Sequence, residues 1–537
     1  MPEETIAAED STGIAGGGIP PRRRLSVNTA IFAVATALSR VAGLLREIVA
    51  ADYFGTSRAV SAFTIASQIP NLMSNLFAQA ALSAAFVPVF TDLLQQGRKR
   101  EAFKLASTLF WLILVVLGVI TAIGMILAGV ILPRFTSANF DGSLAGTLTQ
   151  IMFPVVLVLG LTGMLVGILQ SYDEFSIPAI APVVWNAVIL ALLIALHSSF
   201  RQGVTAYAIA WLVATVVQMV MISSALRRID FRLRVEIDWR DPRIQQVFRL
   251  MLPVTIGLGI VNLDALINST FGALVNAQGP RAIQFAFLIY MLPQGIFSVA
   301  VSTVLFPTLS RQAARRAPAE MRRTIGNGMR QINLLLIPAA AGMLLLATPI
   351  TRLVLQHGHF NAESTRLTSE ALRWFAVSLP FGGLNLLLTR TFFALQRPWI
   401  PTKLAGINMV VDVILSVALY KPLGIAGLVI GTAVANMVMT WLLLRRLRIG
   451  FNGRLEGAQT LMITMRILVA SAITGGIARG VWTGVSDLVG GSLPGQIASV
   501  GLAVAIAGAF YAWAVLGMRV PEARQIEALV LGRLRRG

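Results

Sequence analysis

Charged side chains inside apolar segments are the residues of this sequence that could do chemistry. The first apolar segment, residues 28–50, carries Arg40, Arg46 and Glu47. A charge at the centre of a bilayer costs roughly 2.5–3.5 kcal/mol, so each of these residues needs a polar cavity or a partner. Arg40 and Arg46 are about 9 Å apart along a helix axis and could line one cavity at two depths. Alternatively, Arg46 and Glu47 lie at the membrane surface and only Arg40 is deep.

Two other apolar segments carry polar side chains that could face the same cavity. On segment 60–94 they follow one side of a helix: Ser74, Asn75 and Gln79. On segment 367–394 they are charged: Glu370, Arg373 and Arg390. Small polar residues also hydrogen-bond between neighbouring membrane helices, and this alternative stays open for the first group. In the second group the spacing of Glu370 and Arg373 predicts that they pair on one helix face.

Oxygen-bearing side chains on two later segments could bind a cation. They are Asp264 and Asn268 on segment 250–277, and Asn408 and Asp412 on segment 400–420. The spacing of Asn408 and Asp412 puts them on one helix face. Carboxylate and amide oxygens are the ligands that hard cations prefer. The sequence therefore predicts a Na⁺ or H⁺ coupling site, with a buried Asp hydrogen-bonded to a neighbouring helix as the alternative. No other cofactor is predicted.

The sequence lacks the constellations that enzymes use. It contains no cysteine, which excludes disulfides, thiol chemistry and cysteine-ligated zinc. The three histidines, His197, His357 and His359, are predicted in loops on one side of the membrane, which disfavours a buried histidine site. There is no GxxxxGK[ST] loop for a nucleotide and no HExxH or GxSxG motif. We therefore expect neither an enzyme nor an ATP-driven pump.

The composition predicts the helices that must position these residues. Of 537 residues, 56% are hydrophobic and only 13% are charged, with a mean hydropathy of +0.75. These values exclude a soluble globular enzyme and a disordered chain. No strand-like alternation of useful length is present, so an all-α polytopic membrane protein is expected. Its fourteen predicted spans are 28–50, 60–94, 106–132, 147–170, 178–196, 204–226, 250–277, 283–308, 330–349, 367–394, 400–420, 423–444, 462–483 and 495–517.

Basic residues set the expected orientation. The chain carries 44 basic and 24 acidic residues, a net charge of +20. The basic residues concentrate in the two tails and in the loops after spans 2, 6, 8 and 12, whereas the intervening loops hold one or two each, for example Arg281. By the positive-inside rule both termini are cytoplasmic, in agreement with an even number of spans. The same bias explains the net charge without a nucleic-acid partner.

An internal repeat divides the predicted spans into two lobes. The segment GILQSYDEFSIPAIAPVVWN is echoed about 220 residues later by FALQRPWIPTKLAGIN. Each copy contains six spans, so both enter the membrane from the same side, and such parallel repeats build transporters with the substrate site between the lobes. The expected parts are a disordered tail (1–25), an N-lobe (26–228), a cytoplasmic interfacial helix or linker (229–249), a C-lobe (250–448), two further spans (449–518) and a cytoplasmic tail (519–537).

The chain resembles the MurJ (MviN) lipid II flippases of the multidrug/oligosaccharidyl-lipid/polysaccharide exporter superfamily. The resemblance is carried by LSRVAGLLREIVAADYFG (39–55), IPNLMSNLFAQAALSAAFVPVF (69–90), FPTLSR (306–311) and the 6+6+2 pattern of spans. It implies two lobes that alternate between inward-open and outward-open states. The implied substrate is the undecaprenyl-pyrophosphate-linked peptidoglycan precursor, lipid II, moved to the outer leaflet.

The resemblance also implies site residues. Arg40 and Arg46 match two cavity arginines of the family, and Glu47 matches the acidic residue that follows them. The matches to the family's Na⁺ site are Asn408, Asp412 and Thr432, with Asn268 or Asp264 from span 7. The departures are Ser74 and Leu288 in place of arginines and Gln79 in place of a glutamate. Either Arg373 or Arg390 compensates, or this member moves a different lipid-linked substrate.

The sequence is compatible with three functions. The first is a lipid II flippase of the bacterial inner membrane, monomeric, in contact with membrane lipids and with cell-wall synthesis proteins as possible partners. The second is a cation-coupled exporter of another lipid-linked oligosaccharide or of a drug. The third is a non-transporting scaffold. An anionic pyrophosphate suits arginine forks, and export of about two negative charges gains roughly 4–5 kcal/mol per 100 mV, inside negative.

Overall fold

The computed structural model describes most of the chain. The backbone is described for residues 21–77, 80–172, 174, 176–200, 203–229, 233–235, 238, 240–452 and 456–524. Within these ranges the side chains of 21–33, 74–77, 80–85, 88, 228, 250, 252–262 and 264 are not described. All regular elements of the described part are helical, in agreement with the predicted fold class.

The helices overlap the predicted spans, but several begin or end well away from the predicted limits. In chain order they are α1 (Pro21–Phe54), α2 (Arg58–Phe77), α3 (Ala80–Gln95), α4 (Lys99–Ile131), η1 (Leu132–Phe135), α5 (Gly142–Met152), α6 (Pro154–Ser171), α7 (Ser176–Leu196), α8 (Gly203–Leu226), η2 (Arg227–Ile229), α9 (Pro242–Val275), α10 (Gly279–Pro293), the π-helix η3 (Gln294–Ser298), α11 (Val299–Ala314), α12 (Pro318–Leu345), α13 (Ala347–Leu355), α14 (Ala362–Ala394), α15 (Trp399–Gly450), α16 (Gly457–Val489) and α17 (Leu493–Gly517). Ten stretches of the described chain are long and apolar enough to cross a membrane. The chain is thus a polytopic helical membrane protein.

Local sequence explains where several helices break. Proline lacks an N–H and is tolerated in the first turn of a helix, so Pro154 separates α5 from α6 inside one predicted span. In α15 the two spans predicted at 400–420 and 423–444 meet at Gly424, which interrupts the helical backbone with φ +59°.

The last part of the segment predicted as an interfacial helix or linker, 229–249, belongs to α9 from Pro242 onward. Asp241 caps a helix by accepting a hydrogen bond from the Arg243 N–H, and Pro242 takes the first helical position. From there α9 continues without a break to Val275. The cap and the apolar segment behind it therefore form one 34-residue helix rather than a surface helix followed by a span.

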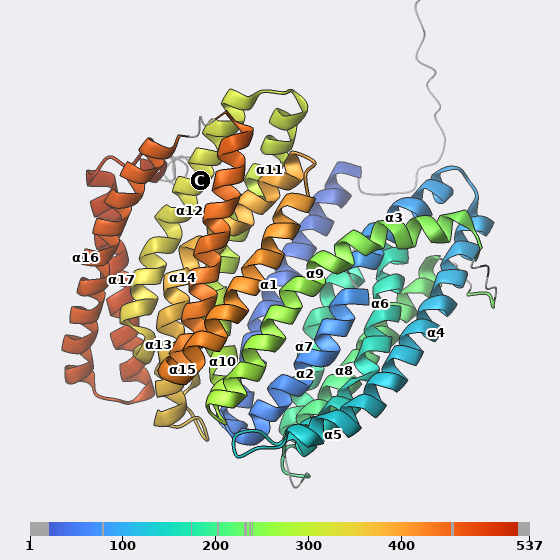
Figure 1. Cartoon of the computed structure of the whole chain (residues 1–537), viewed down its shortest axis with the longest axis horizontal. Coiled ribbons are helices and arrows are strands. Elements are labelled where there is room, and N and C mark those ends of the chain that lie inside the picture. Colours follow the sequence, from blue (N-terminus) through green and yellow to red (C-terminus); the bar gives the residue numbers. More distant parts are fainter. Residues whose placement is uncertain are drawn as a thin grey trace, which may run out of the picture.

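The helices gather into two bundles. In Figure 1, α2–α8 lie on the right, α10–α17 lie on the left, and α1 and α9 run between them. We call α1–α8 the N-bundle and α10–α15 the C-bundle. Each has its own apolar core, and α9 packs against α2 and α3 on one side and α15 on the other. The bundles converge at their lower ends in this view, where α1 ends.

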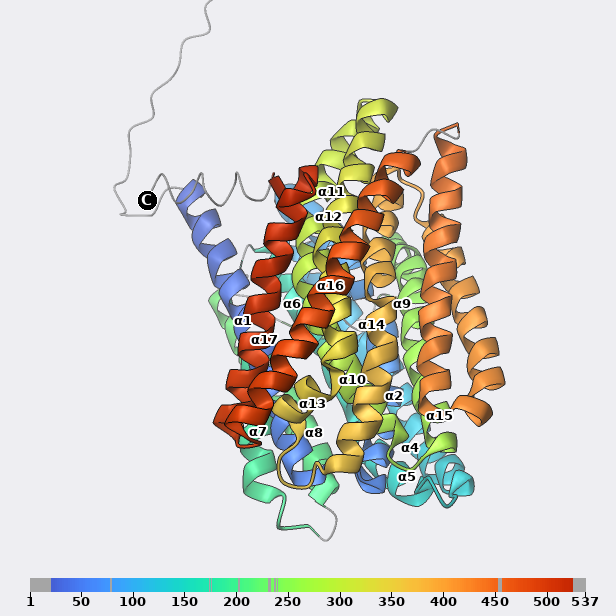
Figure 2. The same ribbon diagram turned by 90° about the vertical axis from the view of Figure 1, so that its left-hand side faces the viewer.

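The hairpin α16–α17 is attached to the outside of the C-bundle, as Figure 2 shows. Leu334 and Ile337 of α12 pack against Ile463 and Ile467 of α16. The Tyr511 hydroxyl of α17 donates to the Leu334 carbonyl at 2.7 Å. The α16–α17 hairpin therefore packs on α12 and α13 at the outside of the C-bundle.

A buried ionic cluster fixes the carboxy-terminal segment to α12. Arg330 of α12, 7% exposed, donates to Glu522, 1% exposed, and lies 3.2 Å from Glu456. Removing one partner of a buried ion pair leaves an uncompensated charge, which costs far more than the loss of an exposed pair.

We expect Glu522→Ala to destabilise the protein by about 3–5 kcal/mol, because Arg330 keeps only its longer contact to Glu456. The measurement is the thermal unfolding midpoint of the purified protein in detergent. Glu363→Ala, which breaks an exposed pair with Arg366, is the control and should cost at most about 1 kcal/mol. Equal shifts for both variants would contradict a structural role for the Arg330 cluster.

Candidate functional site

One carboxylate joins the two bundles. Glu47 of α1 is 7% exposed, and its two oxygens accept from different arginines. Oε1 lies 2.7 Å from Arg46 of the same helix, and Oε2 lies 2.7 Å from Arg281 of α10. The Tyr207 hydroxyl of α8 donates to Oε1 at 3.3 Å. The cluster therefore connects α1 and α8 of the N-bundle to α10 of the C-bundle.

Arg281 is the partner that sequence reasoning missed. Its position just before the apolar run 283–308 predicts a loop residue. The structure corrects this: Arg281 is 1% exposed, donates to Gln284 at 2.6 Å and lies 4.2 Å from the centre of the Phe285 ring. The only sequence signal for it is an arginine three residues before a glutamine on an apolar helix. Leu288 stands where the resemblance implies an arginine, but α10 still supplies an arginine, Arg281.

Arg46 is held by the N-bundle. Its side chain is 12% exposed, donates to Asn186 of α7 at 3.0 Å, and lies 5.0 and 5.5 Å from the ring centres of Trp185 and Trp211. Aromatic faces stabilise a guanidinium that has lost its water. Two guanidiniums and one carboxylate leave one positive charge in excess, which is a favourable environment for an anion.

Arg40 differs from Arg46 in its surroundings. Its side chain is exposed, and within the described part of the chain its guanidinium has no hydrogen-bond or ion-pair partner. It reaches across to the π-helix η3 of the C-bundle, where a Cβ on Gly295 would lie 2.8 Å from its Nη1. Arg46 and Glu47 are therefore enclosed by the protein, whereas Arg40 is accessible between the bundles.

Close contacts between the bundles continue to the end of α1, which we call the gate end: Asp52–Thr56 together with Gln278, Gly358–His359 and Ser364. The Thr56 hydroxyl contacts Gln278 at 2.8 Å and Ser364 at 2.7 Å. The His359 N–H donates to the Asp52 carbonyl at 2.8 Å. A Cβ on Gly358, which has φ +51°, would lie 2.3 Å from Asp52 Oδ1, so the contact requires glycine. The molecule is closed at this end.

A second polar cluster lies between α9 and α15. The Asn268 amide donates to Asp412 Oδ2 at 2.9 Å and to Thr432 at 3.4 Å. Asp412 is 1% exposed, and Ser416 on the next turn is fully buried. The side-chain oxygens of Asn268 and Asn408 are buried and accept no hydrogen bond from the described residues. A set of carboxylate, amide and hydroxyl oxygens fits a hard cation such as Na⁺.

The remaining predicted site residues lie elsewhere or outside the described part. The side chains of Ser74, Asn75, Gln79 and Asp264 are not described. Arg390 donates to Thr303 of α11 at 2.7 Å. Arg373 donates to Thr348 of α13 at 3.1 Å, and the predicted Glu370–Arg373 pair is wrong because Glu370 faces Arg366 at 3.7 Å. Neither Arg373 nor Arg390 joins Arg40 or Arg46 through any described contact.

The gate end allows a direct test of closure in a chain that has no native cysteine. Thr56→Cys and Ser364→Cys replace hydroxyls that lie 2.7 Å apart, so the double variant should form a disulfide under mild oxidation. Adding Gly358→Ala should reduce this cross-linking severalfold, because its Cβ collides with Asp52. Gly97→Ala is the control, since Gly97 also has positive φ but has open space around it. Undiminished cross-linking in the Gly358 variant would show that this contact does not determine closure.

Comparison with known proteins agrees with this architecture. The sequence model of the family described as "Lipid II flippase MurJ" matches residues 50–520. The lipid II flippase MurJ of Burkholderia cenocepacia is 30% identical over 424 residues, covering 77% of this chain and 82% of that protein. A probable lipid II flippase MurJ of Rhizobium meliloti is 31% identical over 418 residues, covering 76% and 78%.

Solved structures share the fold. A structure described as lipid II flippase MurJ in an inward closed conformation has a TM-score of 0.76 at 21% identity, covering 91% of this chain and 99% of that one. An inward-facing multidrug transporter of the MATE family has a TM-score of 0.66 at 15% identity, covering 77% and 94%. With the family match spanning most of its length, this chain belongs to the MurJ family of lipid II flippases.

Proposed function

We propose that this protein flips lipid II from the cytoplasmic to the outer leaflet of the bacterial inner membrane by alternating access. The observation that carries the proposal is the accessible Arg40 guanidinium, which lies between the bundles of a MurJ-family chain without a described partner. An arginine fork matches the oxygens of a pyrophosphate and can bind them with two parallel hydrogen bonds. Arg40 is thus the first contact for the anionic part of the substrate.

Arg46 and Glu47 supply the second step. In the closed gate Arg46 is occupied by Glu47 and Asn186. A pyrophosphate moving from Arg40 toward Arg46 competes with Glu47 for both guanidiniums, Arg46 and Arg281, and its negative charge repels the Glu47 carboxylate. Substrate arrival at Arg46 thereby favours opening of the gate end, since the two binding events compete for the same donors.

The proposed topology has fourteen crossings and both termini in the cytoplasm. Counting α15 twice at Gly424 and adding α1, the α2–α3 pair and α9 to the ten apolar stretches gives fourteen. The basic residues of the tails and alternate loops support this orientation. The gate end then faces outward, and the closed gate corresponds to an inward-facing state.

Two energy sources suit an anionic cargo. Moving about two negative charges outward gains roughly 4–5 kcal/mol per 100 mV of membrane potential, inside negative. The cluster around Asp412 adds a candidate Na⁺ or H⁺ site, which Asn268, Asn408 and Thr432 would complete. Because α9 packs on both bundles, cation binding between α9 and α15 could bias their relative positions.

Arg40→Ala should abolish rescue of a bacterium depleted of its own lipid II flippase, whereas the wild type should rescue it. Losing two charge-assisted hydrogen bonds should weaken lipid II binding by the purified protein about ten- to a hundredfold. Arg134→Ala, an exposed arginine outside the cluster, is the control and should rescue normally. Rescue by Arg40→Ala would remove Arg40 from the path, and failure of a well-inserted wild type would indicate a different lipid-linked substrate.

The cation site predicts Na⁺-dependent stability. Replacing K⁺ with Na⁺ at constant ionic strength should raise the unfolding midpoint of the wild type, with a stabilisation of about 1.4 kcal/mol when Na⁺ is near ten times its dissociation constant. Asp412→Asn should eliminate this effect, because the site loses its charge. Asp487→Asn on an exposed position of α16 is the matched control and should keep it. A Na⁺ response that survives Asp412→Asn would place the ion elsewhere.

A further inference from the structure

A pocket of about 560 Å³ lies on the flank of the C-bundle, away from the site between the bundles. Its walls come from the end of α12, from α13 and from the first half of α14, and no residue of the N-bundle lines it. Figure 2 shows α13 and α14 between the α16–α17 hairpin and α15. Because no residue of the N-bundle lines it, the pocket lies outside the proposed transport route.

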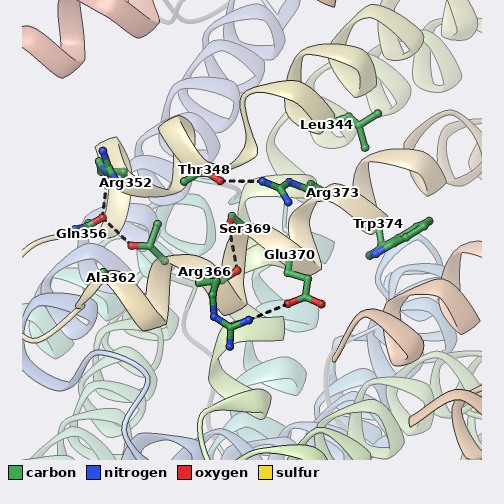
Figure 3. A pocket seen from close by; sticks show the side chains of 11 residues that line it. Leu344, Thr348, Arg352, Gln356, Ala362, Arg366, Ser369, Glu370, Arg373 and Trp374 are labelled. Atoms are coloured by element: carbon green, nitrogen blue, oxygen red, sulfur yellow. Dashed lines mark hydrogen bonds and ion pairs between the residues drawn. The ribbon is translucent and has the colours of Figure 1, made fainter. Parts of the chain in front are cut away.

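Three guanidiniums surround the pocket, and two of them have no described carboxylate partner. Arg366 is neutralised by Glu363 at 2.6 Å and by Glu370 at 3.7 Å. Arg373 donates to the Thr348 hydroxyl at 3.1 Å and Arg352 to the Gln356 amide oxygen at 3.3 Å. Figure 3 shows Arg373 and Thr348 pointing toward one another across the pocket. The pocket therefore contains two guanidiniums, those of Arg352 and Arg373, whose described hydrogen-bond partners are uncharged.

The depth of the pocket corresponds to the headgroup level of a bilayer. Along α14 the polar first third ends at Arg373, and the next charged residue is Arg390. Trp374 follows immediately and is 38% exposed, as is Leu344 of α12 at 39%. Exposed tryptophans concentrate where hydrocarbon meets headgroups. The ligand must therefore combine an anionic group near Arg352 and Arg373 with an apolar part along Trp374 and Leu344.

We propose that this pocket binds the phosphate of an anionic phospholipid. A phosphodiester oxygen can accept from the free N–H groups of Arg352 and Arg373, while Thr348 and Gln356 orient the two side chains. The acyl chains then lie against Leu344 and Trp374. Basic pockets between membrane helices bind anionic headgroups in this way. Arg373 thus acts as a lipid-binding residue of the C-bundle, independently of the proposed transport function.

The test uses Trp374 as the reporter in the full-length protein. The protein is reconstituted in phosphatidylcholine nanodiscs that contain an equal small fraction of brominated phosphatidylglycerol or brominated phosphatidylcholine. The chain has nine tryptophans, so the Trp374 signal is the difference between the wild type and Trp374→Phe. We expect stronger quenching by the brominated phosphatidylglycerol, with each of the two arginines contributing about five-fold to the preference.

Matched variants separate a site from general surface charge. Arg352→Gln and Arg373→Gln should each reduce the preference about five-fold, whereas Arg366→Gln, which removes the same charge from an arginine already paired, should retain it. Equal quenching by both lipids in the wild type, or an equal loss in all three variants, would overturn the proposal. Suppression of the preference by inorganic phosphate would overturn the lipid assignment and indicate a soluble phosphate ligand.

Discussion

The carboxylate of Glu47 has to satisfy two guanidiniums from different bundles in a place that water hardly reaches. Each oxygen lies 2.7 Å from one arginine, so separating the bundles removes Arg281 from a charge that cannot readily be hydrated. Breaking a buried pair by removing one partner costs about 3–5 kcal/mol. The closed conformation therefore persists until something replaces a partner of Glu47. In the proposed mechanism an anion that binds the arginines replaces these partners, and substrate charge is thereby linked to the position of the bundles.

Steric fit complements this electrostatic constraint at the gate end. The backbone around Asp52 meets the backbone around Gly358 so closely that a side chain has no room on either glycine, Gly55 or Gly358. In the proposed mechanism the ionic cluster selects for the charge of the ligand that opens the gate. The glycine contacts constrain the shape of the gate, because a Cβ on either glycine would collide with the facing backbone. The two features lie on the same helix, α1, and so move together.

The C-bundle carries three polar features with separate positions. The ionic contact to Glu47 comes from α10, the oxygen-rich cluster around Asp412 lies between α9 and α15, and the basic pocket with Arg373 is lined by α12, α13 and α14. The α9 helix packs on both bundles and contacts α15 beside this cluster. The pocket shares no lining residue with either the cluster or the gate end. Charged residues in apolar segments thus take part in different kinds of contact. The helix on which such a residue lies does not show which kind of contact it makes.

Composition and the spacing of apolar runs were enough to predict an all-helical polytopic protein and the approximate positions of most helices, because these depend on local hydrophobicity. The family resemblance could also be read from the sequence, because it rests on motifs contiguous in the chain. The tertiary structure decided that Arg281, 234 residues away, completes the cluster. It also decided that Arg373 faces Thr348 rather than Glu370. Such pairings depend on which helix faces are brought together by packing, and hydropathy treats every charge on a helix alike.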